Sequence, residues 1–395
     1  MVTCDILKIP QYKIGVFVLE KVRFGIISTG MIAHFHAKSI LDDGRAELVA
    51  VCGHSSMEKT RAFAEKYNVK KVYMDFKELS CDNTVDAVCV CSPSGLHGVH
   101  TIECLQNGKH VLCEKPLEIK SELMTEMINI ANEKQLKLGC VFPNRTRTGL
   151  RRAKKIIDSG ILGRMTIVEC QYRGYRSPAY FTSSNWKGTK KYDGGGCLMN
   201  QGIHAIDTMC WLAGDVKSVY GTAKAILRDI EVEDTAMAIL EFVNGAKGVL
   251  MGTTISNIPE NAPEGDRLRI EFEKGTILYA EGKTNLYIRK SVSNFSVENK
   301  LPDIVSLDSY NFNKTDVDED VIKIALDDKQ GPVVSSTTDP SNVDMESHFY
   351  IVSNFITAVL EDKDPYIPGE SARKSVDVVL AVYRSSETGE KIDIK

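Results

Sequence analysis

Two segments of the chain combine residue types that could move protons or bind a small ligand. The first is GKHVLCEKPLEI at 108–119, in which an apolar strand ends in Glu114, Lys115 and Pro116. Ligands of doubly wound sheets bind beyond the carboxyl ends of the strands, so a lysine in this place would face a ligand cleft. The alternative is a solvated lysine at the end of an ordinary strand, and this segment alone does not decide between the two.

The second segment is YDGGGCLMNQGIHAID at 192–207. Its three glycines, Gly194–Gly196, predict a backbone that lies close to a ligand. In the helix predicted to follow, Asn200, His204 and Asp207 are spaced by four and three residues and should share one face. An imidazole beside a cleft can transfer protons near neutral pH. A helical histidine can equally be a core or surface residue, so its role depends on what the fold brings near it.

A third segment, GIISTGMIAHFHA at 25–37, joins the first regular strand to the first helix. Its Ser28-x-Gly30-x-x-Ala33 fits the dinucleotide pattern G-x-G-x-x-A with serine at the first glycine. In that pattern the turn and the helix N-terminus hold the pyrophosphate. An ordinary strand–helix turn is the alternative. The predicted cofactor-binding residues of this turn are Ser28, Thr29, Gly30, Met31 and Ile32.

The end of the second strand bears on which dinucleotide would bind. An Asp or Glu there normally binds the ribose 2′-hydroxyl, but this strand ends VAVCGHSS with Gly53 in that place. Glycine removes a carboxylate that would repel a 2′-phosphate, and His54, Ser55 and Lys59 are nearby donors. The pattern favours NADP over NAD, although NAD bound through backbone groups alone remains the alternative.

Alternating strands and helices should position these segments. Between residues 22 and 142, apolar strand patterns alternate with helical ones, which predicts right-handed βαβ units and a mostly parallel Rossmann sheet. Near-continuous apolar strands such as DAVCVC agree, because a parallel sheet is covered on both faces. The predicted strands are 22–27, 46–53, 70–73, 86–93, 110–115 and 136–142.

The second part of the chain has a helical pattern at 149–159 and then long β-type stretches. Several strands follow one another with no helix between them, and Asn244-Gly245 marks a hairpin turn. We therefore predict an α/β protein of two domains. Residues 1–143 would hold an N-terminal extension and a Rossmann NAD(P)-binding domain. Residues 144–395 would form an α+β domain with a mainly antiparallel sheet.

Composition excludes several classes of protein. The 395 residues carry a net charge of −4, without the basic excess of a nucleic-acid binder. No apolar run approaches the ~20 residues that span a bilayer, and residues 1–21 lack the uninterrupted apolar core of a signal peptide. The 11 cysteines include no Cys-x-x-Cys pair, so we expect free thiols and a cytoplasmic location. His34-x-His36 and His97-x-x-His100 lack converging carboxylates, and we expect no metal site.

Together these segments resemble the Gfo/Idh/MocA family, the relatives of glucose–fructose oxidoreductase and inositol dehydrogenase. The resemblance runs from about Val22 to the C-terminus. It implies a Rossmann domain, a C-terminal domain whose open sheet forms a homodimer or homotetramer, and oxidation or reduction of a sugar or cyclitol carbinol. Its marks, in chain order, are GIISTGMIA, SPSGLHGVH, GKHVLCEKP, Asn144-Arg145, WKG at 186–188, GGGCLMNQGIHAID, EVEDT at 231–235 and AVYRSSETG.

The resemblance also implies roles for individual residues. Lys115 would hold the substrate hydroxyl and the nicotinamide ribose, and His204 would be the general acid/base. Asn200 stands where inositol dehydrogenase-like members carry aspartate, and because asparagine cannot relay a proton, Lys115 and His204 would carry more of the work. The implied substrate-binding residues are Lys115, Arg145, Trp186, Lys187, Asn200, Gln201 and His204. The implied cofactor-side residues are Ser92, Pro93, His97 and Glu114, and Gln201 also matches such a position.

The favoured hypothesis is an NAD(P)-dependent oxidoreductase that transfers hydride between nicotinamide and a carbinol carbon of a sugar, sugar derivative or cyclitol. One alternative is a non-catalytic regulator that senses a dinucleotide or sugar on the same scaffold. Retention of Lys115 and His204 disfavours it, because a sensor has no chemical need for both. A glycosidase that uses NAD as a transient oxidant is a further alternative, but the Gly-His-rich motif usual for it is absent from the sequence.

Overall fold

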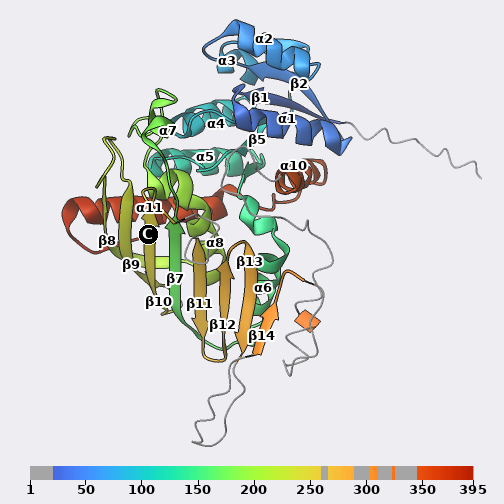
Figure 1. The fold of residues 1–395 in the computed structure, drawn as a ribbon. Helices are drawn as coiled ribbons and strands as arrows, with labels where there is room; N and C mark the ends of the chain where they lie inside the picture. Colours follow the sequence, from blue (N-terminus) through green and yellow to red (C-terminus); the bar gives the residue numbers. More distant parts are fainter. Residues whose placement is uncertain (1–20, 259–265, 289–302, 310–322, 325–344, 395) are drawn as a thin grey trace, which may run out of the picture.

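The computed structural model describes residues 21–258, 266–288, 303–309, 323–324 and 345–394. These residues form two sheet domains, one above the other in Figure 1. The predictions made for the N-terminal extension and for most of the polar stretch 290–342 fall outside the described residues.

The upper domain is a six-stranded sheet with parallel neighbours throughout, as predicted. Its strands are β1 Val22–Ile27, β2 Ala46–Cys52, β3 Lys71–Tyr73, β4 Ala87–Val90, β5 His110–Cys113 and β6 Leu138–Cys140. The order across the sheet is β3-β2-β1-β4-β5-β6, so the direction in which strands are added reverses between β1 and β4. All residues of β4 are buried, which fits a central strand covered on both faces.

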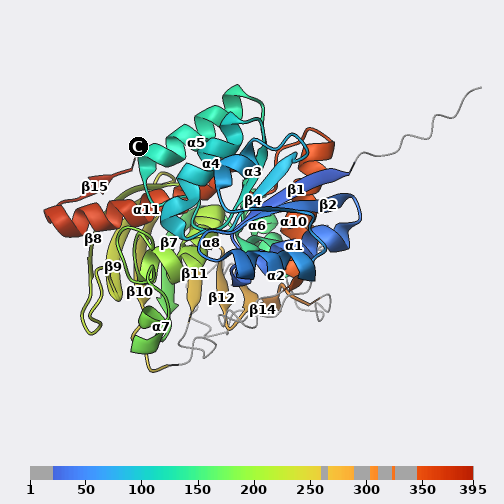
Figure 2. The same ribbon diagram turned by 90° about the horizontal axis from the view of Figure 1, so that it is seen from above.

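Helices on both faces cover this sheet. They are α1 Met31–Asp43, α2 Met57–Lys66, α3 Phe76–Ser80, α4 His97–Gln106 and α5 Ser121–Glu133. Figure 2 shows α1 and α2 on one face and α3, α4 and α5 on the other. This change of face follows from right-handed crossovers on either side of the reversal between β1 and β4.

The lower domain is built on a nine-stranded sheet with the order β14-β13-β12-β11-β7-β10-β9-β8-β15. Its strands are β7 Met165–Arg173, β8 Val216–Lys224, β9 Thr235–Phe242, β10 Lys247–Thr253, β11 Arg267–Phe272, β12 Gly275–Ala280, β13 Lys283–Ile288, β14 Asp303–Ser306 and β15 Ile392–Asp393. Only β7 and β10 pair in parallel among these described strands, so the sheet is mainly antiparallel, as predicted. Asn244-Gly245 lies in the predicted hairpin between β9 and β10.

The described helices of the lower domain pack on one face of its sheet, and none of them covers the other face. They include α6 Thr148–Asp158, α8 Ile203–Ala213 and α11 Gly369–Thr388, with the short α7 Pro178–Thr182 at the top of the sheet. Along β9, buried and exposed residues alternate, because successive side chains of a strand point to opposite faces. A π-helix at Cys197–Gly202 runs directly into α8.

The helix α10 Met345–Leu360 returns to the upper domain although it follows the lower sheet in the chain. Arg45, just after α1, donates from Nη1 to Thr357 Oγ1 at 2.9 Å. The rings of Phe24 on β1 and Phe355 on α10 have centroids 6.4 Å apart. The predicted domain boundary therefore separates the two sheets, but the upper sheet is also covered by a helix from beyond that boundary.

Candidate active site

The residues predicted for the nucleotide site lie at one edge of the upper sheet. Ser28–Gly30 follow β1, Gly53 follows β2, Ser92-Pro93 follow β4, and Glu114-Lys115 follow β5. Because these strands are parallel, their carboxyl ends share that edge, and the strand order reverses between β1 and β4. Doubly wound sheets bind dinucleotides at such a switch point. The fold therefore assembles one candidate site from four separate segments.

The turn at Gly30 has room for a ligand. α1 begins directly after it, and no side chain caps the helix N-terminus. A Cβ built on Gly30 would meet only Ser28 Oγ, at 3.4 Å, within the protein. By contrast, Ser56 caps α2 by accepting a hydrogen bond from the Lys59 amide. Free helical N–H groups beside an open backbone fit a pyrophosphate, so these residues suit a bound dinucleotide.

Ser28 gives the turn a feature that the glycine pattern does not have. Its φ is +104°, in the region that favours glycine. Its Oγ accepts a hydrogen bond from the Gly30 amide at 3.1 Å. The serine therefore holds a strained backbone and occupies an N–H group that a pyrophosphate oxygen would otherwise use.

Gly53 has a packing role that changes the argument about NADP. A Cβ on Gly53 would lie 1.8 Å from Thr60 Oγ1 and 2.9 Å from Thr60 Cβ. Close packing of β2 against α2 therefore accounts for the glycine without reference to a 2′-phosphate. His54, Ser55 and Lys59 are exposed beside it and remain candidates to contact the adenosine ribose.

Lys115 points from the upper sheet to the segment that carries His204. Its Nζ donates to the Asn200 backbone oxygen at 2.8 Å and lies 3.5 Å from Asn200 Oδ1. Burial lowers the pKa of Lys115, with Glu114 and Asp193 opposing the shift. The peptide bond between Lys115 and Pro116 is cis. The ammonium therefore bridges the two predicted catalytic segments.

A carboxylate that the sequence argument missed lies behind Asn200. Asp193 is 1% exposed, and its Oδ1 accepts from Asn200 Nδ2 at 2.6 Å. Its Oδ2 accepts from the Gly188 amide at 2.8 Å. Burial raises the pKa of Asp193 to about 6. Asn200 stands where related enzymes carry aspartate, but the Asp193 carboxylate is bound to the Asn200 side-chain amide, which in turn contacts Lys115.

His204 lies on the first turn of α8 with its ring edge-on to Phe142, centroids 6.0 Å apart. Within the described part of the chain, no hydrogen bond joins its imidazole to the protein. Burial, together with the Lys115 ammonium, lowers the pKa of His204 to about 3. The ring is therefore neutral at pH 7 and both of its nitrogens can meet a ligand.

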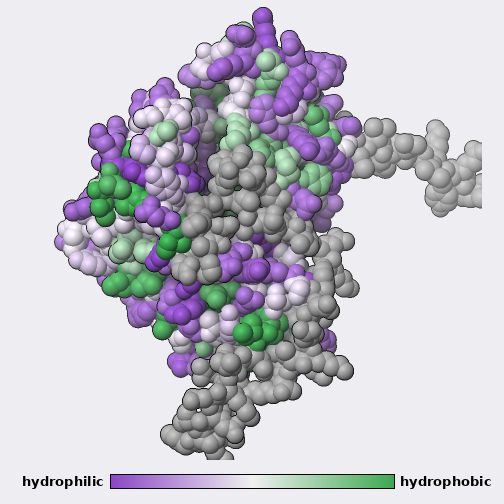
Figure 3. Space-filling view, viewed as in Figure 1, coloured by the Kyte–Doolittle hydropathy of each residue, from purple (hydrophilic) through white to green (hydrophobic). Residues whose placement is uncertain are grey.

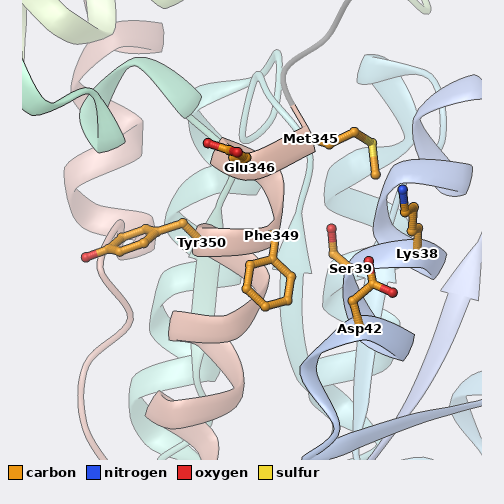
Figure 4. Close-up of a pocket in the computed structure, with 7 residues that line it drawn as sticks. All are labelled: Lys38, Ser39, Asp42, Met345, Glu346, Phe349 and Tyr350. Atoms are coloured by element: carbon orange, nitrogen blue, oxygen red, sulfur yellow. The ribbon is translucent and has the colours of Figure 1, made fainter. Parts of the chain in front are cut away.

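A separate hollow of about 380 Å³ lies between α1 and α10 (Figure 4). Its lining residues on α1 begin at Lys38, which is ~12 Å along the helix from Gly30 at 1.5 Å per residue. This hollow is therefore not part of the dinucleotide turn. Its lining residues are Lys38, Ser39, Asp42, Met345, Glu346, Phe349 and Tyr350.

Comparison with known proteins identifies this arrangement. A model of the oxidoreductase family with an NAD-binding Rossmann fold matches residues 22–142, and a model of the GFO/IDH/MocA C-terminal domain matches 150–278. The NADP-dependent scyllo-inositol 2-dehydrogenase IolU of Bacillus subtilis is 30% identical over 258 residues, 65% of this chain and 75% of the relative. The chain belongs to the Gfo/Idh/MocA family.

Two further relatives agree with this family. D-glucoside 3-dehydrogenase of Escherichia coli is 32% identical over 241 residues, 56% of this chain and 67% of the relative. The WlbA dehydrogenase of Bordetella pertussis, solved with NADH and UDP-GlcNAcA, is 26% identical, with a TM-score of 0.77 over 95% of this chain and 98% of that one. The predicted family and fold class are confirmed, and this Gfo/Idh/MocA member is an NAD(P)-dependent oxidoreductase.

The three glycines of the second segment serve packing. A Cβ on Gly194 would lie 2.3 Å from Ile119 Cγ2. One on Gly195 would lie 2.1 Å from the Tyr383 hydroxyl, and one on Gly196 would lie 1.8 Å from the Glu233 backbone oxygen. Close packing therefore accounts for these three glycines without a ligand, and the predicted approach of their backbone to a ligand stays a prediction.

Glu233 of the EVEDT motif holds the same segment in place. It is buried and accepts hydrogen bonds from the Gly196 amide at 2.8 Å, the Leu198 amide at 2.9 Å and the Tyr383 hydroxyl at 2.8 Å. Glu233 of EVEDT and Tyr383 of AVYRSSETG, two motifs far apart in the sequence, thus fix the backbone that leads to Asn200 and His204.

Arg145, just after the predicted domain boundary, forms a buried ion pair with Asp207 on α8. Arg145 Nε lies 2.8 Å from Asp207 Oδ2 and Nη2 lies 2.6 Å from Oδ1, while Nη1 donates to Ser371 Oγ at 2.7 Å. Arg145 is 3% exposed and Asp207 is 0% exposed. These contacts hold the guanidinium against Asp207 and Ser371, which makes Arg145 a positioning residue in this structure. Its predicted substrate contact stays a prediction. Asn200 lies in the π-helix, so the predicted common helical face with Asp207 is wrong.

His97 joins the ends of β4 and β5. Its Nδ1 lies 2.6 Å from the Pro116 backbone oxygen and its Nε2 lies 2.8 Å from the Ser92 backbone oxygen. The ring is 1% exposed and both nitrogens face protein oxygens, so in this structure it positions Ser92 and the loop after Lys115. Its predicted contact with a cofactor stays a prediction. Pro93 is half-buried at the same edge and its predicted contact stays a prediction.

Glu114 faces inward. Its Oε1 lies 2.8 Å from His36 Nε2 on α1 and 3.8 Å from His348 Nε2 on α10. Burial alone would raise the pKa of Glu114, but hydrogen bonds from His348 and His36 hold it well below its usual range. The side chain therefore anchors the segment that carries Lys115, and its predicted contact with the cofactor stays a prediction.

The remaining predicted substrate residues gather near α7. Gln201 Nε2 donates to the Tyr180 hydroxyl at 3.1 Å. Lys187 Nζ lies 4.1 Å from the centroid of the Tyr180 ring and 6.0 Å from that of Trp186. Tyr180 itself was not predicted, because no sequence signal connects it with Gln201.

Two general findings concern the described residues alone. No helix among them has the length and apolar character needed to cross a bilayer. In the same residues, no three His, Cys, Asp or Glu side chains gather as metal ligands would.

Proposed function

We propose that this chain oxidises or reduces a carbinol carbon of a sugar, sugar derivative or cyclitol, with Lys115 and His204 handling the hydroxyl proton. The observation that carries this proposal is that Lys115 reaches the segment of His204 at the dinucleotide edge, where the His204 imidazole has no hydrogen-bond partner among the described residues. Names of relatives such as scyllo-inositol 2-dehydrogenase and D-glucoside 3-dehydrogenase support the substrate class.

The bound nicotinamide supplies the hydride acceptor or donor. In the direction of oxidation, the carbinol C–H bond breaks and its electron pair leaves with the hydride, while the hydroxyl proton passes to the neutral His204. The Lys115 ammonium donates to the same oxygen and stabilises its developing negative charge. Asn200 and Asp193 hold Lys115 at that position. The low pKa of His204 favours onward release of the proton.

The decisive experiment is a screen of sugars and cyclitols for reduction of NAD+ and NADP+, followed by Lys115→Met and His204→Gln on the best substrate. Both variants should lower kcat by at least about 100-fold, in line with general acid–base and electrostatic contributions, while dinucleotide binding persists. If Lys115→Met turns over as fast as the parent enzyme, its assigned role is wrong. Dinucleotide binding without turnover of any sugar would favour a regulator.

We propose that either NAD or NADP is held at the same edge, with His54, Ser55 and Lys59 meeting the adenosine ribose. A carboxylate at position 53 would collide with Thr60, so it cannot test this contact cleanly. His54→Asp places the negative charge at an exposed neighbour. We expect it to raise KM for NADP+ at least ten-fold relative to NAD+, through the loss of a donor and the gain of repulsion. An unchanged NADP+/NAD+ ratio would remove these residues from the ribose site.

We propose that copies of this chain form a homodimer or homotetramer through the open face of the lower sheet. Met237 and Ile239 on β9 and Val249 on β10 are 53%, 62% and 50% exposed on that face. Figure 3 shows apolar patches over these strands. Exposed apolar side chains gathered on one sheet face are the kind of surface through which proteins associate. Ile239→Asp should shift the mass measured by light scattering toward the monomer; an unchanged mass would refute this interface.

We also propose a reducing, cytoplasmic location. The ten described cysteines are free thiols, and nine of them are buried. Buried thiols behave as small apolar core residues and persist in a reducing compartment.

A further inference from the structure

A group of charged and aromatic side chains lies beside the catalytic lysine. Tyr180 on α7 has two cations against its ring: Lys187 Nζ at 4.1 Å and Arg176 Cζ at 5.4 Å from the centroid. We call Arg176, Tyr180 and Lys187 the Tyr180 cluster. Lys187 also donates to Ser183 Oγ at 3.0 Å. Neither cation is needed for the proton transfer described above.

Contacts tie the Tyr180 cluster to the reacting centre. The Tyr180 hydroxyl accepts from Gln201, the neighbour of Asn200, and Asn200 in turn accepts from Lys115. The charges act on one another as well. Burial lowers the pKa of Lys187, with Asp193 opposing the shift and Arg176 adding to it. Arg176 also adds to the lowering of the pKa of Lys115.

The carboxylates near the two lysines are already engaged. Asp193 acts on both Lys115 and Lys187 and accepts from Asn200 and Gly188. Glu114, which also acts on Lys115, is held by His36. Lys187 forms no ion pair with any carboxylate in the described part of the chain. A half-buried ammonium that is paired only with a hydroxyl and a ring face would gain from an anion. Tyr180 also keeps its own hydroxyl proton to donate, because Gln201 is the donor in their contact.

We propose that the Tyr180 cluster binds an anionic substituent of the substrate, a carboxylate or a phosphate, while Lys115 and His204 engage the carbinol. The substrate class is then an acidic sugar derivative and not a neutral sugar. The inference rests on the proposed function, and it names the substrate recognised at the same site. Lys187 and Tyr180 are the specificity-determining residues, with Arg176 as a second cation on the same ring.

The test compares matched sugars that differ only in the acidic group. Glucose, galactose and mannose are each assayed as the neutral sugar, the uronate and the 6-phosphate, with NAD+ and NADP+. We expect kcat/KM for the preferred acidic form to exceed that of its neutral partner at least ten-fold, as one charge-assisted contact allows. The uronate and phosphate arms show which anion the cluster prefers. Equal or better turnover of the neutral sugar would overturn the inference and leave the proposed function intact.

Variants then locate the effect. Lys187→Met should lower kcat/KM for the acidic sugar, chiefly through KM, by a factor at least ten times larger than for the neutral partner. Lys187→Arg should restore most of the loss. Lys190→Met is the matched control, since it removes the same charge from an exposed side chain on the same loop and should change nothing. Equal losses on acidic and neutral sugars would show a structural role and refute the inference.

A binding readout separates this inference from the proposed function. Melting temperature is measured with NADPH and each sugar at millimolar concentration, in the parent protein and in Lys187→Met. A Lys187-dependent rise with uronate or phosphate, without turnover of any sugar, would sink the proposed reaction and keep the anion site. Absence of both the kinetic preference and the Lys187-dependent rise would overturn the anion site.

Discussion

The buried pair of Arg145 and Asp207 gives the sharpest test of how this protein is held together. Two parallel hydrogen bonds join the guanidinium and the carboxylate, and their side chains are 4% and 0% exposed. Burial raises the pKa of Asp207, while Arg145 pulls it back down. Removing one partner leaves an uncompensated buried charge, which costs about 3–5 kcal/mol. At ~2–4 °C per kcal/mol for a domain of this size, Arg145→Met should lower the melting temperature by about 6–20 °C.

A double-mutant cycle isolates the pair. Arg145→Met, Asp207→Leu and the double variant are unfolded in denaturant, and their free energies of unfolding are compared with the parent. Each single variant should lose about 3–5 kcal/mol, and the double variant should lose less than the sum by ~2 kcal/mol or more, because it buries no lone charge. Additive losses would refute the reasoning.

Kinetics on the same variants separate this role from substrate binding. The family resemblance implies that Arg145 contacts the substrate, which would raise KM without lowering stability. The structure implies the reverse: a large loss of stability, with KM of the remaining folded enzyme changed less than three-fold. A KM raised ten-fold or more in a variant that melts like the parent would restore the substrate role.

Three further perturbations address the site itself. Asp193→Asn removes the group whose pKa is raised to about 6. Below about pH 6 the parent enzyme should lose activity, because Asp193 takes up a proton and its hydrogen bond with Asn200 weakens. The variant should show a pH–rate profile without this loss at acidic pH. A loss that persists in the variant would count against the role of Asp193. Because the pKa of Asp193 is raised in the folded state, its ionisation costs stability as the pH rises from about 4 to 6. Between these pH values the free energy of unfolding of the parent should fall relative to that of the variant. Ser28→Gly relieves a positive φ and frees the Gly30 amide. Titration calorimetry should therefore find the dinucleotide bound about two- to ten-fold more tightly, which is the value of one hydrogen bond. Weaker binding would show that the Ser28 hydroxyl itself contacts the dinucleotide. Gly196→Ala places a Cβ 1.8 Å from the Glu233 backbone oxygen, a clash that no side-chain rotation relieves. The melting temperature should therefore fall by several degrees, and turnover should be lost. An unchanged melting temperature with normal turnover would contradict the packing role.

The fold could be predicted because its signals are local and repeated. Strands such as β4 are apolar at every position and buried on both faces, as such a run predicts. In β9 burial alternates although the sequence TAMAILEF is nearly all apolar, so its exposed face could not be predicted from polarity alone. The return of α10 to the upper domain could not be predicted, since its contacts with α1 span more than 300 residues of chain. Hydrophobic periodicity tells which face of a helix is buried, but not against which partner.

The site could be predicted only in part, for a related reason. Lys115 and the turn at Gly30 were found because they follow strands, and the ends of parallel strands must share an edge. The contact of Asp193 with Asn200 could not be predicted, because it depends on a π-helix that no sequence pattern indicates. The orientation of His97, with both ring nitrogens toward backbone oxygens, could not be predicted, because a motif fixes a position in the chain but not the direction in which a side chain points.

The same geometry explains why the motifs of this chain are so widely spaced. Glu233 and Tyr383 are 150 residues apart, yet both converge on the backbone at Gly195–Gly196, where even a methyl group would collide. The carboxylate fixes two amides at the start of the π-helix, and the π-helix in turn sets Asn200 against Lys115 and leads into His204. A proton-transfer pair split between two domains needs such a rigid support, because a misplacement of about 1 Å can cost roughly 100-fold in rate. The EVEDT and AVYR motifs therefore belong to the active site through the backbone they hold, although neither needs to touch the substrate.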